Sequence, residues 1–112
     1  MHAATAFLRA GARRVILVSR KAEGHQGLNQ AVERLNALEG IKGEAVSFAI
    51  DISDISGIRE VVARVRAIDD HLDILVANAA ATWGGPFEQT PDTASTKVLD
   101  LNVKSVFNLI RM

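Results

Sequence analysis

Apolar residues along the chain fall into short stretches whose spacing switches between that of a strand and that of a helix. A continuous apolar run at residues 15–18, an alternating run at 46–50 and a second continuous run at 74–77 predict three buried strands. Apolar side chains at a helical period predict helices around and between them, at residues 3–9, 27–39, 54–68 and 92–110. The resulting order, α-β-α-β-α-β-α, is typical of a parallel sheet with helices on both faces.

Glycines and capping residues mark the ends of these elements. Gly11 is placed to end the first helix in a left-handed conformation, which costs glycine little. Ser53 or Asp54 can accept the free N–H groups at the start of the third helix. We expect loops around residues 24–27 and over residues 78–90, and the second of these carries Trp83.

Composition predicts one folded domain spanning residues 1–112, because 48% of the residues are hydrophobic and 23% are charged. Thirteen basic and thirteen acidic residues give a formal net charge of zero, which argues against nucleic acid or an anionic membrane as a partner. No apolar run reaches the roughly 18–20 residues of a membrane span, so we expect a cytoplasmic protein. The N-terminal segment is rich in arginine, which leaves two alternatives: a mitochondrial transit peptide or the end of an amphipathic helix.

Several kinds of chemistry are excluded by residues that the chain lacks. Without cysteine it has no disulfide, no thiolate metal site and no thiol nucleophile. Its histidines, His2, His25 and His71, are too scattered to suggest a metal site. Tyrosine is absent as well.

Polar side chains follow each predicted strand where ligands of open α/β sheets bind, at the carboxyl ends of the strands. Ser19-Arg20 follow the first strand, Asp51-Ile52 the second and Asn78-Ala79 the third. A guanidinium for phosphate, a carboxylate for the adenine amino group and an amide for ribose and backbone would suit a nucleotide. The alternative is that these residues are polar only because the backbone turns there.

Four segments, in this order and spacing, resemble the short-chain dehydrogenase/reductase family. The family's second strand resembles residues 11–20, its adenine-contacting Asp resembles Asp51 in Asp51-Ile52-Ser53, its D-[IV]-L-V-x-N-A-G segment resembles residues 72–80, and its following helix resembles residues 101–107. The resemblance implies a partial Rossmann-like doubly wound parallel sheet whose central first strand is missing. It also matches Asn102 to the Asn of the family's Asn-Ser-Tyr-Lys tetrad, where that residue helps to hold a water-linked proton relay.

The family resemblance, with a charge argument, implies NADP as the cofactor. Family members that use NAD place an acid after the second strand, and its carboxylate would repel a 2′-phosphate. Here Ser19, Arg20 and Lys21 follow that strand, so Ser19 and Arg20 are the expected phosphate contacts, against the alternative of a solvated basic turn. Family members often carry a cofactor-contacting basic residue nine positions after the tetrad Asn, and Arg111 stands there, where it equally suits a surface charge.

The chain also departs from the family pattern. Ala80 replaces the last glycine of Asn-Ala-Gly, which puts the cofactor's placement there in doubt. The phosphate-binding T-G-x-x-x-G-x-G and the Y-x-x-x-K motif are both absent from the 112 residues. We therefore expect a family member truncated at both ends, poorly stable alone because its missing strand leaves sheet edges unpaired.

The first functional hypothesis is a fragment of an NADP-dependent reductase that interconverts a carbonyl and an alcohol and is inactive as given. Its expected partners are nicotinamide dinucleotide, a small carbonyl or alcohol substrate, and another subunit in a homo-oligomer. The alternative is a non-catalytic interaction module that associates with a full-length reductase. A third hypothesis, another small doubly wound domain such as a flavodoxin-like receiver, explains the strands but not the segments around Asn78 and Asn102.

Overall fold

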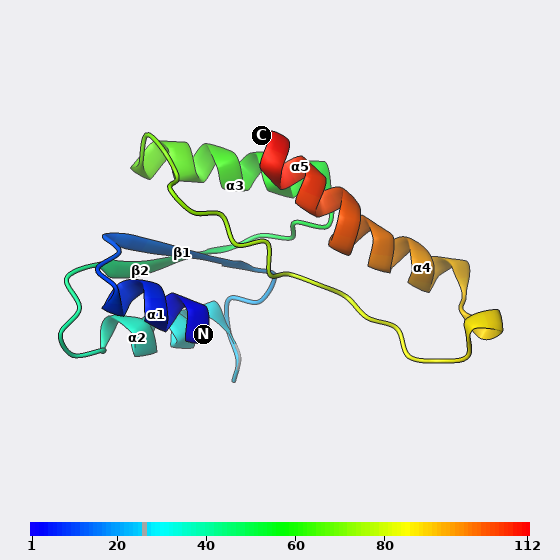
Figure 1. The fold of residues 1–112 in the computed structure, drawn as a ribbon, viewed down its shortest axis with the longest axis horizontal. Coiled ribbons are helices and arrows are strands. Elements are labelled where there is room, and N and C mark those ends of the chain that lie inside the picture. Colours follow the sequence, from blue (N-terminus) through cyan, green and yellow to red (C-terminus); the bar gives the residue numbers. More distant parts are fainter. Residues whose placement is uncertain (26) are drawn as a thin grey trace. The chain divides into compact units, whose positions relative to one another are not determined.

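The computed structural model describes residues 1–25 and 27–112, and Gln26, inside the loop predicted around residues 24–27, lies outside the described residues. The chain divides into two compact units, Met1–Ile50 and Asp51–Met112, and each is described by itself (Figure 1).

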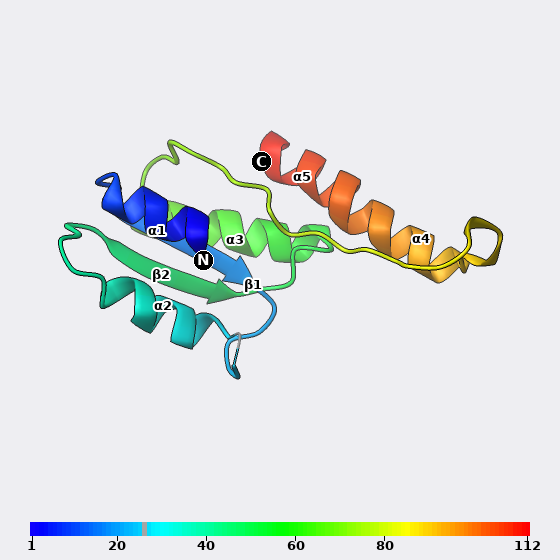
Figure 2. The same cartoon turned by 60° about the horizontal axis from the view of Figure 1, so that its bottom comes forward.

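The first unit contains two helices and a two-stranded parallel sheet in the order α1 (His2–Arg9), β1 (Arg14–Ser19), α2 (Leu28–Asn36) and β2 (Glu44–Ala49). The register pairs Arg14 with Glu44 at one end and Ser19 with Ala49 at the other. Both helices cover the same face of the sheet, as the two views show (Figures 1 and 2). Both predicted strands and both predicted helices of this unit are confirmed.

The core of the first unit lies between these helices and the sheet. Ala4 and Leu8 from α1 meet Leu35 from α2 and Ala45 from β2, and Val15 and Leu17 from β1 pack against the cluster. Leu8 and Leu35 are each only 1% exposed. The alternation of strand side chains therefore gives one face of the sheet to the core.

Two glycines set the turns of the first unit. Gly11 has φ +98°, so the predicted left-handed end of α1 is confirmed. A side chain at Gly43, just before β2, would overlap the backbone carbonyl oxygens of Ala12 and Arg13. Only glycine allows the chain to enter β2 so close to the backbone that precedes β1. The second helix ends at Asn36, earlier than the predicted residue 39.

The second unit begins with α3 (Ile55–Ile68) and continues through an irregular segment to a short 3₁₀ turn, η1 (Phe87–Gln89). A long helix follows, made of α4 (Asp92–Leu99), a wider π-helical turn, η2 (Asp100–Lys104), and α5 (Ser105–Arg111). The α3 helix contacts α5. The predicted helices at 54–68 and 92–110 are confirmed, although the sequence did not predict the π turn inside the second. None of the helices in the described part of the chain is long and apolar enough to cross a membrane.

The strand predicted at residues 74–77 is wrong, so the observed order of elements departs from α-β-α-β-α-β-α at that point. Residues 74–80 form no strand, and Ile74, Leu75 and Val76 are 57%, 47% and 53% exposed. A strand exists only through hydrogen bonds to a neighbour. The described residues offer these apolar side chains no partner strand, because the only sheet among them joins β1 to β2.

Candidate cofactor and catalytic site

Asn102 lies at the middle of η2 and binds the backbone of one residue, Ala81, through both ends of its side-chain amide. Its Nδ2 donates to the Ala81 carbonyl at 2.9 Å, and its Oδ1 accepts from the Ala81 N–H at 2.8 Å. Ala81 follows the predicted cofactor-contacting pair Asn78-Ala79 by two residues. The structure therefore ties the long helix to the loop that carries those residues.

The loop itself is exposed from Asn78 to Ala80. The Asn78 N–H donates to the Val76 carbonyl at 3.0 Å, which closes a tight turn just before the Asn-Ala-Ala sequence. This turn and the Asn102 contact bracket Ala79 and Ala80 on either side. Hydrogen bonds on both sides restrain Ala79 and Ala80, and both residues are exposed. Their backbone N–H and C=O groups are therefore accessible to a ligand.

Asp51 and Ile52 form the connection that leads into α3. Oδ1 of Asp51 accepts from the Ser53 N–H at 2.9 Å, a local turn typical of aspartate. Ile52 is half-buried and Asp51 is exposed. Asp51 therefore presents a carboxylate to solvent at the position where the sequence predicts an adenine contact.

Of the two predicted capping residues, Ser53 and Asp54, it is Asp54 that caps α3. Its Oδ1 accepts from the N–H of Ser56 at 2.7 Å, the N–H of Gly57 at 3.0 Å and the hydroxyl of Ser56 at 2.6 Å. These bonds, the Ser56 hydroxyl first and then the two backbone N–H groups, lower the pKa of the Asp54 carboxyl from its ordinary 3.8. The Asp54 carboxylate therefore acts as the N-cap of α3.

Ser19 and Arg20 belong to the first unit, at the carboxyl end of β1, and both are exposed. The Ser19 carbonyl accepts from the Ile50 N–H at 2.9 Å, which fixes the backbone of this strand end. The Ser19 hydroxyl and the Arg20 guanidinium can both donate hydrogen bonds to an anion at this place, and the guanidinium adds a positive charge. The remaining predicted site residues belong to the second unit.

Arg111 is occupied within its own helix. Its Nε donates to Oδ1 of Asn108 at 2.8 Å, and its guanidinium carbon lies 5.9 Å from the centre of the Phe107 ring. These contacts agree with the surface-charge alternative, and its role toward a cofactor stays a prediction.

Two features of the site carry no signal in the sequence. The backbone of Ala81 serves as the partner of Asn102, and a backbone group is not marked by residue type. Ser105 is 2% exposed and donates from Oγ to the Leu101 carbonyl at 2.5 Å, yet in the sequence it is an ordinary helical serine.

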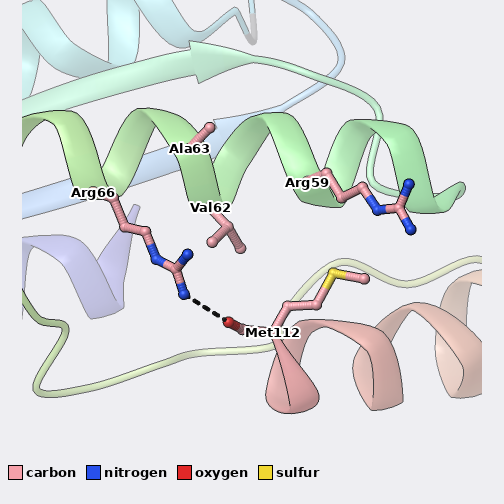
Figure 3. A pocket seen from close by; sticks show the side chains of 5 residues that line it. All are labelled: Arg59, Val62, Ala63, Arg66 and Met112. Atoms are coloured by element: carbon pink, nitrogen blue, oxygen red, sulfur yellow. Dashed lines mark hydrogen bonds between the residues drawn. The ribbon is translucent and has the colours of Figure 1, made fainter.

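A separate open pocket of about 290 Å³ lies along α3 (Figure 3). Arg59 and Arg66 flank an apolar wall of Val62 and Ala63, and Nη2 of Arg66 donates to the Met112 carbonyl at 3.5 Å. None of the predicted site residues lines it. Within the described ranges 1–25 and 27–112, no cluster of three or more His, Asp or Glu side chains is arranged to hold a metal ion.

Known proteins match the chain along nearly its whole length. The family model described as short chain dehydrogenase matches residues 1–112. The chain is 35% identical over 108 residues to the rhamnolipids biosynthesis 3-oxoacyl-(acyl-carrier-protein) reductase of Pseudomonas aeruginosa, a match that covers 96% of this chain and 39% of that protein.

Solved structures of such proteins share the fold. The Pseudomonas aeruginosa RhlG/NADP active-site complex superposes with a TM-score of 0.82 at 33% identity, over 96% of this chain and 39% of that chain. L-Sorbose reductase from Gluconobacter frateurii, complexed with NADPH and L-sorbose, gives a TM-score of 0.82 at 27% identity with the same coverage of each chain. The chain therefore spans 39% of the length of these relatives. Since the family model matches every residue from Met1 to Met112, this chain belongs to the short chain dehydrogenase family.

Proposed function

We propose that these residues are the middle part of an NADP-dependent reductase that interconverts a carbonyl and an alcohol. The observation that carries this proposal is the exposed Ser19-Arg20 pair at the carboxyl end of β1. None of the three residues directly after Val18 is acidic, so nothing in that turn repels a 2′-phosphate. The NADP and NADPH complexes of the two relatives support the choice of cofactor.

Each predicted residue has a role in this proposal. Ser19 and Arg20 bind the 2′-phosphate, Asp51 and Ile52 contact the adenine, and Asn78 and Ala79 contact the ribose through side chain and backbone. Arg111 adds positive charge near the cofactor. When bound, the cofactor supplies or accepts a hydride, and the residues of this chain only bind and orient it.

Asn102 holds the water of the proton relay in the complete enzyme. Its side-chain amide bonds to the backbone of Ala81, so we assign the water to its backbone carbonyl. The general acid of the family is a tyrosine, and residues 1–112 contain none. We therefore expect residues 1–112 by themselves to reduce no carbonyl substrate.

The experiment measures binding of adenosine 2′,5′-bisphosphate and of adenosine 5′-monophosphate to the chain by calorimetry. These probes carry only the adenosine half of the cofactor, and they differ in the 2′-phosphate. We expect the bisphosphate to bind more tightly, and Arg20→Ala to weaken it by about ten-fold or more, as loss of a charge-assisted hydrogen bond predicts. Arg9→Ala, which removes an exposed arginine at the end of α1, is the matched control and leaves both affinities unchanged. Equal affinity for the two probes would contradict the NADP proposal.

A second candidate function is a non-catalytic module that associates with a full-length reductase. The exposed apolar residues Ile74, Leu75 and Val76 favour it, because a segment of this kind, with no partner strand among the described residues, is a template for a strand of another chain. It predicts that the chain co-elutes with an intact reductase on size exclusion and changes its rate. Separate elution at micromolar concentration, with the rate of the reductase unchanged, would remove this candidate.

A further inference from the structure

The π turn η2 separates α4 from α5 and contains Asn102, whose side chain contacts Ala81. In such a turn an N–H bonds to the carbonyl five residues back, as the Ser105 N–H bonds to the Asp100 carbonyl. The turn takes in one more residue than an α-helical turn, so it changes the direction in which its side chains leave the helix axis. Turns of this width are rare, occur mostly as single turns inside α-helices, and are frequent at functional sites.

Ser105 follows η2 directly, and its side chain turns back onto it. Oγ donates to the Leu101 carbonyl at 2.5 Å, and the residue is 2% exposed. A buried hydroxyl has no water to bond with, so this contact satisfies it. A serine bonding to the carbonyl four residues earlier competes with the helical ladder and bends the helix. The carbonyl in question is next to Asn102 in the chain, inside the π turn.

We propose that Ser105 is a positioning residue, which holds η2 in its wide form and thereby directs the Asn102 amide onto Ala81. The inference rests on the proposed function, which gives Asn102 its part in the proton relay. It adds that two contacts orient Asn102. One is the bond from the buried Ser105 hydroxyl to the neighbouring Leu101 carbonyl, and the other is the pair of bonds between the Asn102 amide and the Ala81 backbone. The loop that begins at Asn78 is then held in place through the same chain of contacts.

The competing explanation is that Ser105 only fills a small buried space in the helix. In that case Ser105→Ala would cost little, because alanine is the better helix former and needs no hydrogen-bond partner. The two explanations therefore differ in what happens at Ala81, twenty-four residues away in the chain.

The test follows the Ala81 N–H and the side-chain NH₂ of Asn102 by nuclear magnetic resonance of the ¹⁵N-labelled full chain. Ser105→Ala removes the hydroxyl, and Ser105→Cys keeps a similar volume with a much weaker donor. Ser105→Thr keeps a hydroxyl that reaches back to the same carbonyl in helices. We expect hydrogen exchange at Ala81 to become roughly two- to ten-fold faster with alanine and cysteine and to return to the wild-type rate with threonine.

Ser95→Ala is the matched control. Oγ of Ser95 donates to the Asp92 carbonyl at 2.8 Å in α4, outside the π turn. Its removal deletes a similar bond in the same long helix, and we expect no change at Ala81. In an Asn102→Ala background, Ser105→Ala should have no further effect on Ala81, because the contact through which it acts is already lost.

Unchanged Ala81 exchange and unchanged Asn102 side-chain signals in the alanine and cysteine variants would overturn the proposal. Should the alanine variant not fold, the comparison of cysteine with threonine decides the question, since both keep the space filled. The readout needs no cofactor and no turnover. Failure of the chain to bind adenosine 2′,5′-bisphosphate would therefore count against the proposed function alone and leave the role of Ser105 standing.

Discussion

Asn36 and Asn102 use their side-chain amides in the same way, each closing two hydrogen bonds with the backbone of a single alanine. Asn36 accepts from the Ala45 N–H at 2.7 Å and donates to the Ala45 carbonyl at 3.0 Å, and Asn102 does the same with Ala81 at 2.8 and 2.9 Å. An amide side chain presents a donor and an acceptor side by side, as a peptide group does. Each asparagine therefore takes the place of a neighbouring strand for the length of one residue.

Asn36→Ala tests how much the two hydrogen bonds between Asn36 and Ala45 stabilise the first unit. Ala45 is 2% exposed, so the substitution leaves its N–H and carbonyl without their partner in the core. We expect the free energy of unfolding to fall by about 1–3 kcal/mol, measured by urea denaturation. Asn29→Ala, at an exposed position of the same helix, is the control and should leave the midpoint unchanged. Equal midpoints for both variants would show that water replaces the amide without loss.

Helix α3 shows how a single carboxylate defines the start of an element. The Asp54 carboxylate accepts hydrogen bonds from two backbone N–H groups that would otherwise have no partner in the first turn. It also accepts one from the Ser56 hydroxyl. The bonded form is the ionised one, which is why the pKa of Asp54 lies below 3.8. The contribution to stability is therefore complete above 3.8 and is lost as the pH falls through the lower pKa of the folded state.

Asp54→Asn separates this charge from the cap. Asparagine is also a good N-cap, but it does not titrate. We expect the wild-type chain to lose stability relative to the variant as the pH falls below 3.8, while the difference between them stays constant above it. Amide hydrogen exchange of Ser56 and Gly57 across this range gives the measurement. A difference that does not change with pH would mean that the Asp54 carboxylate contributes nothing through its charge.

Elements were predictable from the sequence where neighbouring residues alone determine them. The apolar spacing of α1, α2 and α3 and the β-branched run of β1 identify those elements, and the Ser53-Asp54 pair located the start of α3 to within one residue. Residues 74–77 have the same apolar character as β1 but form no strand. Periodicity reports which side chains prefer burial, whereas a strand also needs a partner backbone, which a local pattern does not supply.

The candidate site divides along the same line. The family resemblance pointed to Asn102, and residue type and position after the first strand pointed to Ser19 and Arg20. The contact between Asn102 and Ala81 joins residues 21 positions apart, so no local pattern predicts it, and the π turn and the bond from Ser105 to Leu101 are not marked by residue type. The helical spacing of apolar residues over 92–110 predicts one uniform helix. It does not predict the π turn that begins at Asp100.

At the scale of the whole molecule, the apolar side chains that remain exposed are concentrated in the second unit. Among the described residues, twelve large apolar side chains are exposed, and eleven of them follow Asp51: Ile68, Leu72, Ile74, Leu75, Val76, Trp83, Phe87, Leu99, Val103, Phe107 and Ile110. Exposed apolar surface of this extent drives association. Residues 74–76 add a backbone that pairs with no strand of the described residues, which makes them the segment from which we expect self-association to start.

Ile74→Lys tests that expectation. A charge within an unpaired apolar segment discourages strand pairing between chains, and Ile74 is 57% exposed, so the substitution leaves no cavity. We expect a several-fold lower rate of aggregation by light scattering at equal concentration, with the thermal midpoint unchanged. Ala67→Lys adds the same charge at an exposed position of α3 and is the control for net charge. If both variants slow aggregation equally, the effect comes from overall charge and not from this segment.

The contact between Asn36 and Ala45 bears on which edge of the small sheet can accept another strand. In a parallel pair, alternate residues of each strand bond to the neighbour and the residues between them face away. Glu44 bonds to Arg13 and Ile50 to Ser19, so Ala45 faces outward from β2, and there the Asn36 amide is already docked. On β1 the backbone N–H and C=O groups of Arg14, Ile16 and Val18 point away from β2, and the sheet of the described residues has no third strand on that side. The Asn36 amide occupies one outward position of β2, whereas the outward side of β1 faces no strand of the described residues, so we expect an added strand to pair beside β1.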